Sequence, residues 1–120
     1  MIDMEKLEAK IRVKLDGFQA DGGKLIRGIF RSGDDCRCLV DACFPNTITE
    51  KEINMHRAEV LSSVLDIPIA NNNMWVMILA WDEPIPWKNQ NHFQKVNPYY
   101  QLGYRLQRDY KPVSASCVKK

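Results

Sequence analysis

The sequence predicts a helix-rich α+β fold in a single domain, with about four helices and a small β-hairpin. Its 120 residues are enough to bury one hydrophobic core. The apolar fraction of 45% and the charged fraction of 27% are ordinary for a globular protein. Several segments show helical periodicity, and one short β-type run precedes a glycine turn. We expect a globular domain over residues 1–112 and a flexible basic tail over residues 113–120.

An amphipathic helix is predicted over residues 3–18. Asp3 can accept hydrogen bonds from the free N–H groups of the first turn. Gly17 and the Asp21-Gly22-Gly23 cluster predict the end of the helix. The apolar stripe recurs at spacings of three and four and consists of Met4, Leu7, Ile11, Leu15 and Phe18.

Two short apolar runs surround the turn Gly33-Asp34-Asp35. The first covers residues 24–31 and the second begins at Cys36. This arrangement is typical of a β-hairpin, although the second arm could instead become helical near Cys38.

A second helix is predicted over residues 47–65. Thr47 with Glu50 and Thr49 with Glu52 both match the capping-box pattern. Pro68 disfavours helical geometry at the residue before it, so the helix should stop near Leu65.

The run Met74 to Trp81 is apolar throughout and fits either a buried helix or a central strand. Asn71-Asn72-Asn73 as caps, and an excess of Met, Leu and Ala over β-branched residues, favour the helix, and Pro84 should end the element. Residues 82–97 show no periodicity. Asn97 and Pro98 then begin a final helix that runs to about Lys111, with Tyr99, Leu102, Leu106 and Tyr110 along one face.

Aromatic and basic residues gather near the C-terminus. Residues 81–111 hold seven of the chain's 11 aromatic residues. Residues 88–120 carry seven Lys and Arg against one acid, Asp109. Because Tyr, Trp and Arg dominate binding hot spots, we predict a partner-binding surface here. Its candidate residues are Trp87, His92, Phe93, Tyr100, Tyr104, Arg105 and Arg108.

The favoured function is that of a small non-enzymatic protein-binding protein of the inhibitor, immunity or adaptor type. The plan of the chain resembles short proteins of phages and mobile elements in outline, but no motif identifies a family. The alternative is a nucleic-acid-binding module that uses the basic, aromatic C-terminal helix and the Lys119-Lys120 tail. Finding Arg105 and Arg108 paired with acids would argue against this alternative. A second copy of the chain is a further candidate partner.

A second alternative is a metal-dependent or thiol enzyme. Cys36, Cys38, Cys43 and His56 are the weak candidates for a zinc site, but their spacing is not that of a standard finger. Cys38 or Cys43 could act as a nucleophile if a helix N-terminus lowered its pKa, with His56 or His92 as the base. We expect no enzyme and no cofactor.

The opening residues lack the apolar core of a signal peptide. The longest apolar run, Met74 to Trp81, is far shorter than the roughly 18 residues that span a bilayer. We therefore expect a cytoplasmic protein with reduced cysteines and no membrane contact.

Overall fold

The computed structural model describes residues 2–33, 35–53, 55–83 and 85–115. These residues contain six α-helices and three short strands. Four of these helices have seven residues or more. The predicted fold class, a helix-rich α+β single domain, is confirmed. In chain order the elements are α1 (Met4–Ala20), β1 (Lys24–Arg27), β2 (Cys36–Arg37), the 3-10 turn η1 (Asp41–Cys43), α2 (Glu50–Ile53), α3 (Arg57–Leu65), α4 (Asn71–Asp82), the 3-10 turn η2 (Trp87–Asn89), α5 (His92–Val96), α6 (Pro98–Tyr110) and β3 (Val113–Ser114).

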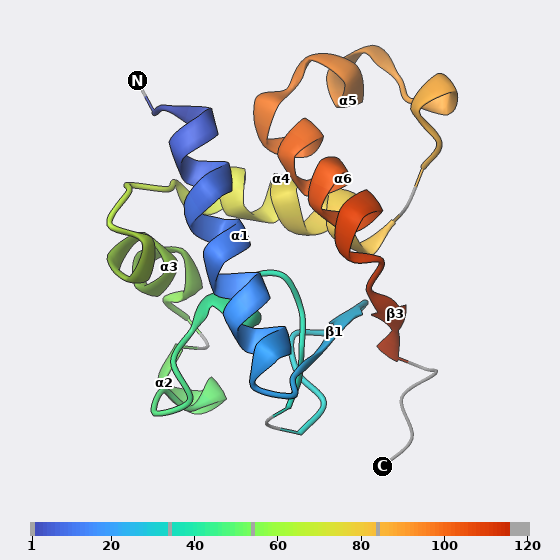
Figure 1. Cartoon of the computed structure of the whole chain (residues 1–120). Helices are drawn as coiled ribbons and strands as arrows, with labels where there is room; N and C mark the ends of the chain where they lie inside the picture. The colour runs from blue at the N-terminus through green and yellow to red at the C-terminus, as the bar shows by residue number, and fades with distance from the viewer. Residues whose placement is uncertain (1, 34, 54, 84, 116–120) are drawn as a thin grey trace.

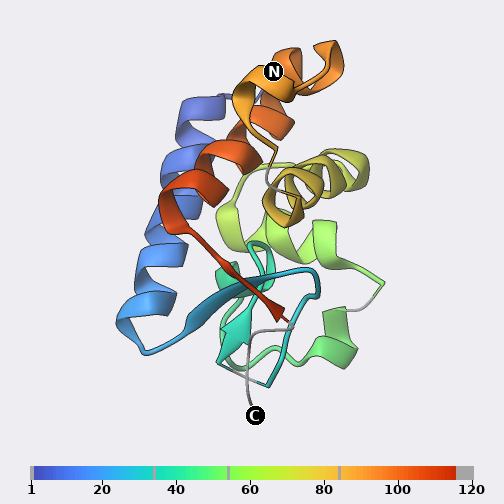
Figure 2. The same ribbon diagram turned by 90° about the vertical axis from the view of Figure 1, so that its right-hand side faces the viewer.

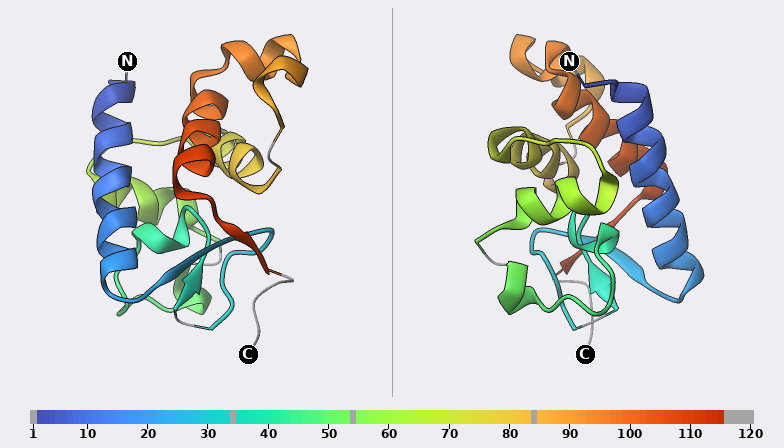
Figure 3. Two further views of the ribbon diagram at one scale, coloured as in Figure 1. Left: turned by 45° about the vertical axis from the view of Figure 1, so that its right-hand side comes forward. Right: turned by 90° about the vertical axis from the view of Figure 1, so that its left-hand side faces the viewer.

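Helices α4, α5 and α6 lie toward one end of the molecule and the sheet toward the other; α2 lies beside the sheet, and α1 runs from one end to the other (Figure 1). Helix α6 packs mainly on α4 and also contacts α1 and α5. The segment from η2 through α5 projects away from the sheet, as Figures 1 and 3 both show. The fold thus consists of a packed body and a projecting segment, which we call the arm and define as residues 85–97.

The sheet differs from the predicted hairpin. Strand β1 lies in the centre and pairs in parallel with β2 on one side and β3 on the other (Figure 2). Among the described residues, antiparallel pairing is limited to a bridge between Arg31 and Arg37. Gly28, with a φ of 98°, turns the chain at the end of β1. The segment that returns after this turn reaches β2 at Arg31, and it is this segment that runs antiparallel to β2.

The C-terminal tail also differs from the prediction. Val113 and Ser114 are paired to Ile26 and Arg27 as strand β3. Residues 116–120, which include Lys119 and Lys120, lie outside the described residues.

The predicted caps form at the starts of two helices, α1 and α6. Asp3 caps α1 by accepting hydrogen bonds from the N–H groups of Glu5 and Lys6. Gly17 does not stop the helix, which continues two residues beyond the predicted residue 18 to Ala20 and ends at the predicted Asp21-Gly22-Gly23 cluster. At Asn97 the cap of α6 forms as predicted, and Pro98 occupies the first turn.

The segment predicted as one helix over residues 47–65 is two helices. The capping box of Thr49 and Glu52 forms and opens the short α2. Helix α3 then starts separately at Arg57 and ends at Leu65 as predicted, with Asp66 in the left-handed conformation.

The run Met74 to Trp81 is helical, as favoured. Helix α4 begins earlier than expected, so the three asparagines lie inside its first turn and Ala70 occupies the cap position. Residues 82–97 contain two elements that periodicity did not predict, η2 and α5. Pro84, the predicted stop of α4, lies outside the described residues.

Helices α4 and α6 meet at unusually small residues. A Cβ atom built on Gly103 would lie 2.4 Å from the Met77 carbonyl oxygen and 2.9 Å from the Ala80 Cβ. Beside this crossing, Trp81 is fully buried and its Nε1 donates to the Ile26 carbonyl at 2.8 Å. The crossing therefore joins the helices to each other and to β1.

A buried charge cluster joins the sheet to α3. Asp41 is fully buried and accepts a hydrogen bond from Arg31 Nε at 2.6 Å. Arg57 donates to both oxygens of the same carboxylate, at 3.0 and 3.2 Å. The Arg57 guanidinium also lies 3.6 Å from the centre of the Phe30 ring. One buried carboxylate thus pairs with two arginines that come from different parts of the chain.

Candidate functional site

The arm carries three of the seven predicted contact residues at its surface. Trp87 is 51% exposed and Phe93 is 50% exposed. His92 is exposed beside Phe93 at the start of α5. The arm therefore presents two large rings to solvent, which is unusual for side chains of this size.

Local hydrogen bonds give the arm a defined shape. Asn91 and Gln94 form a reciprocal capping box that starts α5. Gln90 is buried and donates to the Ile85 carbonyl at 3.5 Å. Gln101 of α6 donates to Gln90 Oε1 at 3.1 Å and also to the Gln94 carbonyl. These contacts hold the arm against α6 through polar groups and leave its rings uncovered.

Trp87 is further positioned by the body of the protein. Its ring centre lies 6.4 Å from that of Tyr104, with the two planes tilted by 50°. Tyr104 is only partly exposed, so it supports Trp87 and contributes little contact surface of its own.

Val96 was missed by the sequence analysis and extends the exposed apolar surface. It is 58% exposed and lies three residues after Phe93 on α5, so both side chains share one side of the helix. The signal was present as an i, i+3 apolar pair, but a helix of five residues is too short for periodicity to reveal. We call Trp87, Phe93 and Val96 the arm surface.

Arginines of α6 are paired with acids. Arg105 Nη2 lies 2.7 Å from Glu8 Oε1, and Arg12 Nη2 lies 2.7 Å from Glu8 Oε2. Burial pushes the pKa of Glu8 upward, but hydrogen bonds from these two arginines outweigh burial and lower it. Arg105 thus joins α6 to α1.

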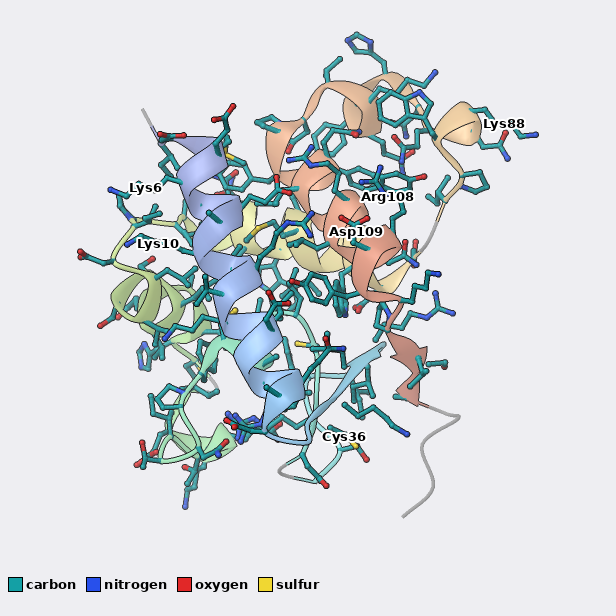
Figure 4. All side chains as sticks on the ribbon, in the orientation of Figure 1. Lys6, Lys10, Cys36, Lys88, Arg108 and Asp109 are labelled. Carbon is teal, nitrogen blue, oxygen red and sulfur yellow. The ribbon has the colours of Figure 1, made fainter. Side chains whose placement is uncertain are left out.

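Arg108 is exposed but also has an acidic partner. Its Nε lies 3.0 Å from Asp109 Oδ1, and Asp109 Oδ2 in turn accepts from Arg12 at 2.8 Å. Figure 4 shows Arg108 and Asp109 next to each other on α6, and Lys88 pointing away from the body on the arm. Both α6 arginines are therefore paired with acids, and this pairing argues against α6 as a nucleic-acid-binding helix.

Tyr100 is the clear error among the predicted contact residues. It is fully buried, and its hydroxyl has no hydrogen-bond partner among the described residues. Burial is the main reason that the pKa of Tyr100 is raised. Tyr100 belongs to the core, where its unpaired hydroxyl group destabilises the folded state.

Tyr100→Phe is expected to increase the free energy of unfolding by about 1 kcal/mol, because it removes an unsatisfied buried hydroxyl and keeps the ring. The measurement is a urea titration followed by circular dichroism. Tyr99→Phe is the matched control, since the Tyr99 hydroxyl is hydrogen-bonded to Asn73 and its removal should destabilise slightly. A destabilised Tyr100→Phe protein would show that the hydroxyl has a partner after all.

The four candidate metal ligands do not come together. Cys38 and Cys43 are buried, whereas His56 is exposed and lies 3.7 Å from Glu59. Across the described residues, no group of three or more histidine, cysteine or acidic side chains has a geometry that would hold a metal ion. Cys36 is partly exposed on β2, as Figure 4 shows.

Neither Cys38 nor Cys43, the thiols of the alternative with a nucleophilic cysteine, lies in an environment that activates a thiol. Burial raises the pKa of both Cys38 and Cys43 to about 12, which is the opposite of the lowering that nucleophilic catalysis needs. Cys43 Sγ instead donates to the Leu39 carbonyl at 3.4 Å. Both thiols act as small core side chains.

Comparison with known proteins gives no assignment: no protein-family model, no curated protein and no solved structure matches the chain. No helix in the described part of the chain is both long and apolar enough to cross a membrane. The candidate function therefore rests on the arm surface and on the chemistry around it.

Proposed function

We propose that the chain is a small, non-enzymatic protein-binding module that engages its partner through the arm surface. The observation that carries this proposal is the exposure of Trp87, Phe93 and Val96, each about half accessible or more, on a segment held in shape by hydrogen bonds. Large exposed apolar side chains grouped together are typical of interaction sites. A surface that is already ordered loses less conformational entropy when it binds.

The charge of the arm indicates the chemistry of the partner. Lys88, His92 and Lys95 lie beside the apolar side chains, and the described arm residues include no acid. A partner with an apolar groove and an acidic rim fits this surface best. Two lysines would neutralise few phosphates, and the nearby α6 arginines are already paired, so we favour a protein partner over a nucleic acid.

Inhibitor, immunity and adaptor proteins are the types of binding protein that this proposal covers. We also propose that the protein is cytoplasmic. The three described cysteines, Cys36, Cys38 and Cys43, have free thiols, which supports a reducing compartment.

The double variant Trp87→Ala/Phe93→Ala is expected to lose the partner. Truncation of a central aromatic anchor typically weakens binding by about 2 kcal/mol, or about thirty-fold. The measurement is an affinity capture from a nuclease-treated host lysate with tagged wild-type and variant proteins. The wild-type protein should retain a stoichiometric protein partner.

Val13→Ala/Met55→Ala is the control, because both side chains are exposed and apolar but lie on the body, at 69% and 84% exposure. It should retain the partner at the wild-type level. Equal capture by the arm variant would contradict the proposed surface. A captured partner that disappears on nuclease treatment would instead support nucleic-acid binding.

A further inference from the structure

A second apolar site lies on α4, apart from the arm surface. A cavity of about 320 Å³ opens between α4 and the segment of residues 28–30 that follows β1. Trp75, Ile78 and Asp82 line it from α4, at positions i, i+3 and i+7, which share one side of a helix. This volume lies at the lower end of the range for small-molecule sites.

Two aromatic rings form one wall of this cavity. Phe30 and Trp75 pack edge to face, with ring centres 5.6 Å apart and an interplanar angle of 63°. The Phe30 ring is held by Arg57, which is itself fixed by Asp41. Trp75 is 46% exposed and Ile29 is 49% exposed, so the opening of the cavity is apolar. The wall is thus preformed before any ligand arrives.

A carboxyl group lies among these apolar residues. Asp82 is half-buried, and its Oδ1 accepts a hydrogen bond from the Gly28 N–H at 3.1 Å. Gly28 is the one hydrogen-bond donor to this carboxyl group among the described residues. Burial raises its pKa, the charge of Glu83 adds to this effect, and Gly28 and Arg27 oppose it. A cation beside Asp82 would stabilise the carboxylate in this environment.

We propose that this cavity binds an organic cation: a primary amine that carries an aromatic or branched aliphatic group. The ammonium group donates to Asp82, and the apolar group packs against Phe30 and Trp75. This ligand complements both the charge and the apolar surface of the cavity. The site is independent of the arm surface and of the function proposed for it.

The test is a titration of the ¹⁵N-labelled protein with phenethylamine, followed by NMR shifts of the Gly28 amide and the Trp75 indole N–H. Both signals should move and saturate together. Phenylacetate, an anion of similar size, should bind far more weakly. Equal binding of the two compounds, or no saturable shift up to the solubility limit of phenethylamine, overturns the proposal.

Asp82→Asn is expected to weaken phenethylamine binding by about tenfold or more, because the charge-assisted hydrogen bond is lost. An asparagine keeps an oxygen for the Gly28 N–H, so the cavity should keep its shape. Glu83→Gln is the matched control and should change the affinity much less, since Glu83 is exposed and outside the cavity lining. Trp75→Ala should also weaken binding. Unchanged affinity in Asp82→Asn overturns the proposal.

Discussion

Asp41→Asn is expected to lower the free energy of unfolding by about 3–5 kcal/mol, the usual loss when one partner of a buried ion pair is removed. Arg31 and Arg57 would keep their buried guanidinium groups, with side-chain exposures of 8% and 4%, and lose the charge that compensates them. Glu50, at 3.7 Å from Arg57, is largely exposed and cannot replace a buried carboxylate. A loss of this size is a large part of the stability of a small domain.

Urea unfolding followed by tryptophan fluorescence measures this effect, because Trp81 is fully buried in the native state. Asp35→Asn is the matched control: the same change in an exposed residue should alter the stability by no more than about 0.5 kcal/mol. Similar unfolding midpoints for the two variants would mean that the buried cluster contributes nothing to stability.

Gly103→Ala is expected to destabilise the protein by about 2 kcal/mol, in spite of the higher helix propensity of alanine. The added methyl group would overlap the Met77 carbonyl oxygen, which is backbone and cannot rotate away. Helix α6 would have to move away from α4, and their shared core would loosen. The change in the urea midpoint measures the loss.

Gly17→Ala provides a control of opposite sign. Gly17 lies inside α1, and a Cβ built on it would meet nothing within 4 Å. Alanine there should stabilise the protein by about 0.5–1 kcal/mol through helix propensity alone. If Gly103→Ala is stabilising too, the helix crossing has more room than the structure shows.

Sequence reasoning succeeded where the determining interaction is local. The caps at Asp3 and Asn97 lie within three residues of the N–H groups that they bind. Such contacts depend on side-chain chemistry at short spacing, which a single sequence displays directly. The helical nature of residues 74–81 was likewise predicted from local composition.

Features that depend on distant residues were missed. Arg57 is 16 positions from Asp41, and nothing in the spacing indicates that the two meet in the core. Strand β3 pairs with β1, which is far away in the sequence. No residue near Val113 indicates this pairing, so the segment was predicted to be a flexible tail. A parallel sheet of such short strands carries almost no period-2 pattern.

The candidate surface was predicted only in part, because which residues of α6 are exposed also depends on contacts with distant parts of the chain. The cluster of aromatic residues indicated Trp87 and Phe93, which are exposed, but composition does not show which side of α6 faces the core. Helix α6 contacts α1, α4 and α5, so more of its circumference is covered than that of a surface helix. Tyr100 is buried for this reason, and Arg105 is paired to α1.

The central position of β1 has a consequence for synthesis on the ribosome. Strand β1 emerges long before its partner strand, because Ile26 and Arg27 pair with Val113 and Ser114, which are far later in the chain. Until then, one edge of β1 offers unpaired backbone groups next to Ile26, a fully buried residue in the finished fold. An unpaired strand edge can pair with another chain. The nascent protein is therefore prone to association until Val113 and Ser114 have emerged, and docking of β3 closes that edge.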